Sequence, residues 1–184
     1  MKTALEMYQY CIDNKLGSGF NRKWGEKHFG IIESNLQPNE KVLITFIGIH
    51  NYVSATKHEN HCAYAITDRR LIVAQKKLIG EYLKIVLLNT LNDVTYNSGL
   101  LMGTLVFDTI KEKFNVFVDK NQANNILQKI NETIFTVKND NERKEISRTP
   151  TSEVDEIKIF KQLLDEGTIT QAEFDAKKKQ ILNT

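Results

Sequence analysis

Two short apolar runs meet at a polar corner in the stretch Tyr64-Ala65-Ile66-Thr67-Asp68-Arg69-Arg70-Leu71-Ile72-Val73-Ala74. The corner runs from Thr67 to Arg70, and its Thr and Asp side chains can accept hydrogen bonds from the backbone just ahead of them, which closes a tight turn. β-Prone runs that are bounded in this way predict the two strands of a hairpin. We expect this hairpin to be the structural centre of the fold, with its charged corner facing water.

The sequence on either side of the hairpin continues the β pattern. Apolar and β-branched residues predict further strands at 42–49, 82–88, 93–97, 102–108 and 114–118. With the hairpin this makes seven strands joined by short turns. Such spacing indicates an antiparallel barrel or sandwich and not a parallel sheet.

Helical patterns flank the strands on both sides. Apolar residues recur at spacings of three and four at 3–15, 21–36 and 121–137, as one buried helical face requires. The last of these helices has a single apolar stripe, so we expect it to close an open end or corner of the barrel. Residues 138–152 are charged and polar and include Pro150, which predicts a linker.

The last thirty or so residues predict a helical hairpin with well-specified ends. Gly167 is placed to end a first helix that Ser152 can cap. Thr170 and Glu173 then have the spacing of a capping box for a second helix. Units under about 40 residues seldom form a stable core alone, so the apolar faces are expected to dock on the first domain, a second copy or a partner. The residues of these faces are Val154, Ile157, Phe160, Leu163, Leu164, Ile169, Phe174, Ile181 and Leu182.

Composition limits the classes of function. Among 184 residues, 25 Lys and Arg face 23 Asp and Glu, for a formal net charge of +2, which argues against a general nucleic-acid partner. The only two cysteines, Cys11 and Cys62, are far apart in the sequence and form no disulfide framework. A reducing, cytoplasmic location fits this usage. The first residues lack the apolar core of a signal peptide, and no run approaches the roughly 18 apolar residues that span a bilayer. We therefore expect any membrane contact to be peripheral.

The order of the elements resembles a known family. Seven short strands followed by one amphipathic helix, with a Thr67-Asp68-Arg69 corner between apolar strands, is similar to bacterial pleckstrin-homology (PH) domains of the YokE-like kind over 42–137. The C-terminal segment resembles a SHOCT domain. The residues of that resemblance are Leu163-Leu164-Asp165-Glu166-Gly167, Ile169-Thr170, Glu173-Phe174 and Lys177-Lys178-Lys179. Both resemblances imply a binding or assembly module and not an enzyme.

Each candidate site in the sequence also has a simpler interpretation. Phosphoinositide-binding PH domains resemble one another in a basic pocket at the first hairpin, but here the loop at 50–61 has Lys57 as its only cation. In that loop His50, His58, His61 and Cys62 could in principle ligate zinc or serve a hydrolase. They lack the spacing of paired ligands, so we expect a solvated loop, a buried structural thiol at Cys62, no catalytic residue, no metal and no cofactor. Five basic residues near the central hairpins could form a basic rim that meets an anionic membrane surface. They are Arg69, Arg70, Lys76, Lys77 and Lys84.

These observations combine into one hypothesis. The chain is α+β: a seven-stranded antiparallel PH-like barrel or sandwich closed by a C-terminal helix, with N-terminal helices and an appended helical hairpin. Its segments are 1–41 (N-terminal helices), 42–137 (PH-like domain), 138–152 (linker) and 153–184 (SHOCT-like hairpin). The expected function is non-enzymatic binding and scaffolding, with the hairpin mediating self-association or binding another protein. The alternative is a peripheral binder of anionic membranes or lipid headgroups.

Overall fold

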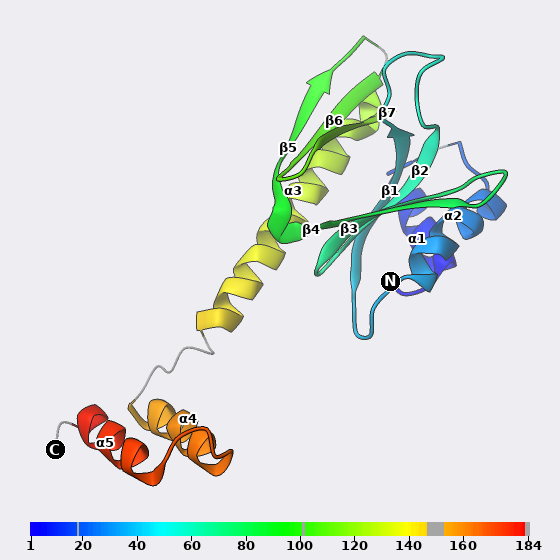
Figure 1. Cartoon of the computed structure of the whole chain (residues 1–184). Coiled ribbons are helices and arrows are strands. Elements are labelled where there is room, and N and C mark those ends of the chain that lie inside the picture. The colour runs from blue at the N-terminus through cyan, green and yellow to red at the C-terminus, as the bar shows by residue number, and fades with distance from the viewer. Residues whose placement is uncertain (18, 101, 147–152, 183–184) are drawn as a thin grey trace. The chain divides into compact units, whose positions relative to one another are not determined.

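The computed structural model describes residues 1–184 except 18, 101, 147–152 and 183–184 (Figure 1). The chain divides into two compact units, Met1–Val137 and Lys138–Thr184.

The first unit contains a seven-stranded sheet whose hydrogen-bonded neighbours are all antiparallel. The strands follow the order β4-β3-β2-β1-β7-β6-β5 across the sheet. Their bounds are β1 (Val42–His50), β2 (His61–Thr67), β3 (Arg70–Lys76), β4 (Glu81–Leu87), β5 (Leu91–Ser98), β6 (Met102–Thr109) and β7 (Lys113–Asp119). All seven predicted strands are confirmed, although β5 is longer than expected. The sheet is not closed into a barrel, because β4 and β5 stand at its two ends and the short 3-10 helix η1 (Leu88–Thr90) joins them.

One core lies between the two halves of the bent sheet. It takes Phe46 and Tyr64 from the β1–β4 half and Leu105 and Phe107 from the β5–β7 half. Two sheet faces that bury their apolar side chains against each other form a sandwich. The sandwich form of the predicted fold is therefore confirmed.

Helix α3 (Lys120–Ile146) closes this sandwich. Its apolar stripe, with Ala123, Ile126 and Ile130, packs into the core between the sheet halves, as predicted. The helix continues beyond Val137, so the first part of the segment predicted as a linker, 138–152, is helical up to Ile146, and residues 147–152 lie outside the described part of the chain. That the segment is a linker stays a prediction. Residues 138–146 contain no Gly or Pro, so a helix that is already formed can extend through them.

Helices α1 (Ala4–Asp13) and α2 (Arg22–Ser34) cover the other face of β1, β2 and β3 (Figure 1). Met7, Phe29 and Ile32 form a second core there with side chains of the sheet. Small residues on that sheet face, including Ala63 and Ala65, leave room for the helices. These strands are consequently buried on both faces.

The second unit contains α4 (Glu153–Asp165) and α5 (Gln171–Ile181). Gly167 has φ +73°. The Thr168 N–H donates to the Leu163 carbonyl at 2.9 Å, and the Gly167 N–H to the Leu164 carbonyl at 3.0 Å; this is a Schellman end. Both hydrogen bonds of the capping box are present: the Thr170 side chain accepts from the Glu173 N–H, and the Glu173 side chain accepts from the Thr170 N–H. Both predicted helix signals are confirmed, whereas the expected cap Ser152 is outside the described residues.

The polar corner at the centre of the sequence is a tight turn, but Arg70 does not face water. Thr67 Oγ1 accepts hydrogen bonds from the N–H groups of Arg69 and Arg70, as predicted. The Arg70 guanidinium donates to both carboxylate oxygens of Glu40, at 2.8 and 2.7 Å, and to the Asn35 carbonyl at 2.7 Å. The exposed fractions of the two paired side chains are 8% for Arg70 and 0% for Glu40. The prediction of a solvent-facing corner is therefore wrong for Arg70, whereas the side chains of Asp68 and Arg69 are 34% and 45% exposed.

The environment of Glu40 favours its charged form. Burial acts to raise the pKa of Glu40, but hydrogen bonds from Arg70, the Gln37 N–H and Thr67 outweigh burial and lower it. Because the folded-state pKa lies below the unfolded value, the stabilisation is present above about pH 4.3 and is lost as the pH falls further.

A polar group is also buried inside the sandwich. The His50 side chain has no exposed surface; its Nδ1 lies 2.8 Å from the Tyr64 hydroxyl and its Nε2 3.3 Å from the Tyr82 hydroxyl. Burial lowers the pKa of His50 to about 4, against smaller opposing effects of nearby Glu59 and Glu112. Burial also raises the pKa of Tyr82 to about 12, and it raises the pKa of Tyr64 well above the ordinary value for a tyrosine. At neutral pH the three groups are therefore uncharged partners in one hydrogen-bonded cluster.

The first testable prediction concerns the buried ion pair. Arg70→Gln should lower the free energy of unfolding by about 3–5 kcal/mol, because it leaves the Glu40 carboxylate buried without its partner. The matched control Arg69→Gln should change it by less than about 0.5 kcal/mol, because Arg69 is exposed. Urea denaturation at pH 7 measures both values. Equal effects of the two substitutions would contradict the assigned role of Arg70.

The second prediction concerns His50. Above pH 6.5, the ordinary pKa of histidine, the His50 ring is neutral in both the folded and the unfolded chain. Between pH 6.5 and about 4 only the unfolded chain binds a proton at this ring, and the folded chain does so only near pH 4. The contribution of His50 to the free energy of unfolding should therefore fall by about 3 kcal/mol as the pH drops from 6.5 to 4. His50→Gln, which cannot titrate, should show a correspondingly shallower decrease in urea denaturation between pH 7 and 4. A His50 imidazole that titrates near 6.5 by NMR would refute the prediction.

Candidate functional site

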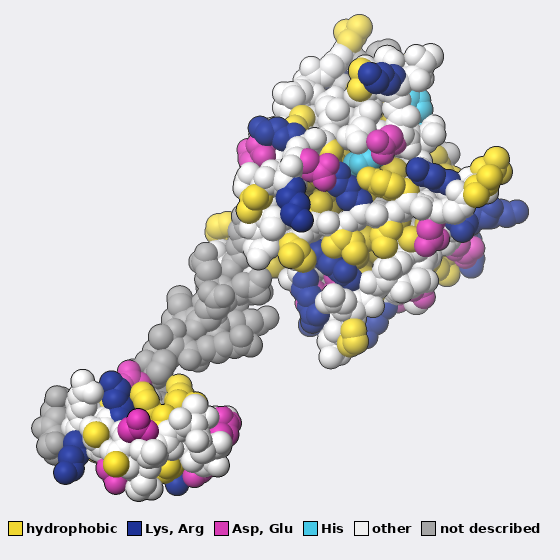
Figure 2. Space-filling model, viewed as in Figure 1, with side chains coloured by type: hydrophobic (Ala, Val, Ile, Leu, Met, Phe, Trp, Pro, Cys, Tyr) yellow, Lys and Arg dark blue, Asp and Glu magenta, His cyan; other side chains and the backbone are white. Residues whose placement is uncertain are grey.

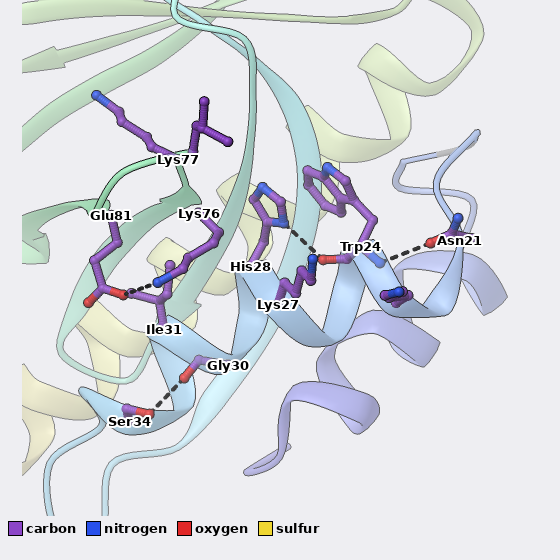
Figure 3. A pocket seen from close by; sticks show the side chains of 12 residues that line it. Asn21, Trp24, Lys27, His28, Gly30, Ile31, Ser34, Lys76, Lys77 and Glu81 are labelled. Carbon is purple, nitrogen blue, oxygen red and sulfur yellow. Dashed lines mark hydrogen bonds and ion pairs between the residues drawn. The ribbon is translucent and has the colours of Figure 1, made fainter.

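Helix α2 and the turn between β3 and β4 form the walls of an open groove in the first unit (Figure 3). Its volume is about 990 Å³. Helix α2 and its cap contribute one wall and the hairpin the other. The lining side chains that can contact a ligand through charge or an apolar surface are Lys23, Trp24, Lys27, His28, Lys76, Lys77, Leu78 and Glu81.

The α2 wall is set by its first turn. The Asn21 side chain accepts a hydrogen bond from the Trp24 N–H at 2.9 Å and so begins the helix. Lys23 and Lys27 are then one helical turn apart and lie on the same side of α2. Trp24 and His28 follow the same spacing, and their rings stack at 3.8 Å with a 13° interplanar angle.

His28 does not add charge to the groove at neutral pH. Its Nδ1 lies 2.9 Å from the Trp24 carbonyl oxygen, which can only accept a hydrogen bond, so the ring proton is on Nδ1. Burial lowers the pKa of His28, and the bond to Trp24 only partly opposes this. The positive charge of the groove therefore comes from lysines.

The hairpin wall ends in an apolar tip. Gly80 has φ +75°, and the Lys77 N–H donates to the Gly80 carbonyl at 3.2 Å, which closes the turn. Leu78 is fully exposed and Ile79 is 90% exposed. Figure 2 shows hydrophobic side chains at the tip of this hairpin with basic side chains beside them.

The basic rim expected from the sequence does not form as one surface. Lys76 and Lys77 line the groove, while Arg69 lies at the other end of β3 and Arg70 is buried on Glu40. Lys84 is only 14% exposed, because its Nζ pairs with Glu112 at 2.9 Å and lies 4.2 Å from the centre of the Phe114 ring. The predicted set is therefore wrong for Arg70 and Lys84.

Sequence reasoning missed Lys23, Lys27 and the exposed tip. The two lysines are spaced one turn apart on either side of Trp24, and Leu78 and Ile79 lie between Lys77 and Gly80. These signals were present, but only the packing of α2 on the sheet shows that they face the same groove.

The histidine-rich loop contributes no assembled site. His50 lies in the core, while His58 accepts a hydrogen bond from the Asn60 N–H in the loop itself. Burial raises the pKa of the Cys62 thiol to about 12, so it is protonated at neutral pH. Cys11 is likewise buried, with its pKa raised to about 12. The described residues contain no group of three or more metal-ligating side chains.

Among the predicted docking residues of the hairpin, Phe174 has another role. It is buried between α4 and α5 and so belongs to the hairpin's own core. Val154 and Leu182 are exposed, as is Ile159, which the sequence analysis did not single out. The remaining members are half-buried: Ile157, Phe160, Leu163, Leu164, Ile169 and Ile181. None of the described helices is long and apolar enough to cross a bilayer.

Comparisons with solved structures gave distant similarities. The C-terminal domain of an unknown protein from Leishmania infantum is 11% identical, with 59% of this chain and 93% of that chain covered and a TM-score of 0.42. The Vps36 N-terminal PH domain is 17% identical, with 56% and 83% covered and a TM-score of 0.41. The linker-DH/PH domains of p115-RhoGEF are 11% identical, with 72% and 40% covered and a TM-score of 0.43. A search of curated proteins gave no significant match.

Two family models match the sequence. The bacterial PH domain matches residues 36–132, more than half of the chain. The short C-terminal domain, SHOCT, matches residues 155–182. Both matches agree with the elements described above: the first contains all seven strands and the first part of α3, and the second contains the α4–α5 hairpin. The chain therefore belongs to the bacterial PH domain family and carries a SHOCT domain after its PH domain.

Proposed function

We propose that this chain is a non-enzymatic scaffold whose α4–α5 hairpin joins copies of the chain or binds another protein. PH and SHOCT domains are binding and scaffolding modules, which supports the general function. The proposed location is cytoplasmic, and the two free, buried thiols are consistent with it.

The observation that carries the proposal is the apolar surface of the hairpin. Val154 is 59% exposed and Ile159 is 44% exposed, while Phe174 is buried between the two helices. A unit of this size buries too little apolar surface to be stable alone. Covering its exposed side chains with a second hairpin or a partner helix would remove them from water and stabilise both.

The buried thiols also favour a non-enzymatic role. A cysteine nucleophile must be a thiolate, and burial holds the pKa of both Cys11 and Cys62 at about 12. His50 is buried among aromatic rings and is neutral at pH 7. These side chains are therefore suited to packing.

The third prediction tests self-association. Light scattering on the full chain should give a multiple of the 21.2 kDa monomer mass. Val154→Ser with Ile159→Ser should shift the chain toward monomer, because these substitutions remove the apolar contact without touching Phe174. The matched control Phe135→Ser changes an exposed apolar residue of α3 and should leave the mass unchanged.

Two outcomes decide between the forms of the proposal. A monomer at all concentrations rejects self-association and leaves binding to another protein. That binding is then tested by whether the full chain retains a partner that the Val154→Ser, Ile159→Ser variant loses. If the full chain neither self-associates nor retains a partner through the hairpin, the scaffolding role of the hairpin is refuted.

A further inference from the structure

We propose that the free edge of β4 is a docking site for an extended segment of another protein, which adds to the sheet as an eighth, antiparallel strand. This segment carries aliphatic side chains at alternate positions. β4 stands at one end of the seven-stranded sheet (Figure 1). The site lies in the first unit and does not depend on the proposed role of the α4–α5 hairpin.

The hydrogen-bond pattern between β3 and β4 fixes which backbone groups of β4 point away from the sheet. The two strands pair in one unbroken register. Bonds just beyond both ends of the pairing set its phase: the Lys77 N–H donates to the Gly80 carbonyl at 3.2 Å, and the Leu88 N–H donates to the Arg69 carbonyl at 3.0 Å. Hydrogen-bonded pairs alternate with non-bonded pairs in antiparallel strands, so the even-numbered residues of β4 bond to β3.

The odd-numbered residues of β4 therefore turn their N–H and C=O groups toward the open edge. For Leu83 and Ile85, neither group has a hydrogen-bond partner among the described residues. The Leu87 carbonyl accepts a hydrogen bond from the Thr90 hydroxyl at 2.8 Å. Another extended backbone offers donors and acceptors at the same spacing, so these groups specify the occupant as a strand.

The side chains of the same residues form an aliphatic stripe beside the free edge. Leu83 packs against the second core, while Ile85 is 43% exposed and Leu87 is 51% exposed. Between them, Lys84 faces the sandwich, where its Nζ pairs with Glu112 at 2.9 Å. Residues directly opposite each other in an antiparallel pair have their side chains on one face. Aliphatic residues at alternate positions of the added strand would therefore cover the stripe.

The other edge of the same sheet is protected against such pairing. β5 has an irregular register between Leu91 and Asp93, and its exposed side chains are polar, among them Asn92, Asp93, Thr95 and Asn97. Bulges and charged side chains are common means of preventing edge-to-edge association. β4 contains no Pro, no Gly and no register shift. The sheet thus blocks one edge and leaves the other open.

The sequence of β4 favours a different chain over a second copy of this one. Full-length antiparallel pairing of β4 with the β4 of a copy would place Lys84 directly opposite the same lysine of the copy. Like charges at opposite positions are destabilising. A segment with aliphatic residues on one face and small polar residues on the other covers the stripe and leaves Lys84 with Glu112.

The fourth prediction uses the full chain and a synthetic peptide as long as β4, in which Val alternates with Thr and charged ends provide solubility. In the free chain the amides of Leu83 and Ile85 should exchange their hydrogens rapidly, and those of Lys84 and Val86, which bond to β3, should be protected. The peptide should slow exchange at Leu83 and Ile85. Hydrogen exchange followed by NMR measures all four amides.

Two N-methylated forms of the peptide test the pairing itself. The valines are expected on the side of the aliphatic stripe, opposite Ile85 and its odd-numbered neighbours, in the pairs that exchange both hydrogen bonds. Methyl groups on the valine nitrogens should therefore abolish binding. Methyl groups on the threonine nitrogens, which point away from β4, should leave binding unchanged.

Substitutions at the edge separate strand pairing from a general apolar contact. Ile85→Pro removes an N–H that faces away from β3, which an edge strand tolerates, and should abolish peptide binding. Ile85→Lys retains the N–H and should weaken binding by about tenfold or more, through lost apolar contact and an added charge. The matched control Thr95→Lys adds the same charge to β5 and should not alter binding. Thermal unfolding checks that each variant is folded, and Ile85→Lys alone suffices if Ile85→Pro is not.

Several results would overturn the proposal. They are protected Leu83 and Ile85 amides in the free chain, exchange at these amides that the peptide does not change, equal binding of the two methylated peptides, and undiminished binding by Ile85→Lys. A change in the light-scattering mass caused by Ile85→Lys would instead assign the edge to a second copy. The Val154→Ser, Ile159→Ser variant should bind the peptide as the native chain does, which separates this site from the scaffolding role of the hairpin.

Discussion

Burial of β1, β2 and β3 on both faces is the constraint from which the rest of the architecture follows. One face packs into the sandwich core with Phe46 and Tyr64, and the other would expose Ile47 and Ile72 to water without a second layer. Helices α1 and α2 supply that layer. Since α2 lies over the end of β3, its lysines face the β3–β4 turn, and the groove is a direct result of this layer.

The buried ion pair of Arg70 and Glu40 fits the same constraint. The segment between α2 and β1 must pass the corner of the β2–β3 hairpin, and Arg70 binds there both to Glu40 and to the Asn35 carbonyl after α2. An arginine suits this position because its planar guanidinium can satisfy a carboxylate and a carbonyl at once. Through these bonds the pair connects the segment that follows α2 to the corner of the β2–β3 hairpin.

Features fixed by neighbouring residues were predictable from the sequence. Thr67 closes its turn, Gly167 ends α4 and Thr170 caps α5, because each uses hydrogen bonds within a few residues. The extension of α3 to Ile146 could have been predicted as well, since residues 138–146 contain no helix breaker. Features that join distant segments could not be predicted from the sequence. The carboxylate that removes Arg70 from the surface is thirty positions away, and no local pattern pairs α2 with the β3–β4 turn.

The two cysteines lie in different layers of the first unit. Cys11 is buried in the core between the helices and the sheet, where its thiol donates to the Thr45 hydroxyl at 3.2 Å. Cys62 is buried in the core inside the sandwich. A thiol reagent can reach each sulfur only when its own layer opens, so the two modification rates would report separately on detachment of the helices and on opening of the sandwich. The native chain thus carries, without any engineered label, one kinetic reporter for each of its two cores.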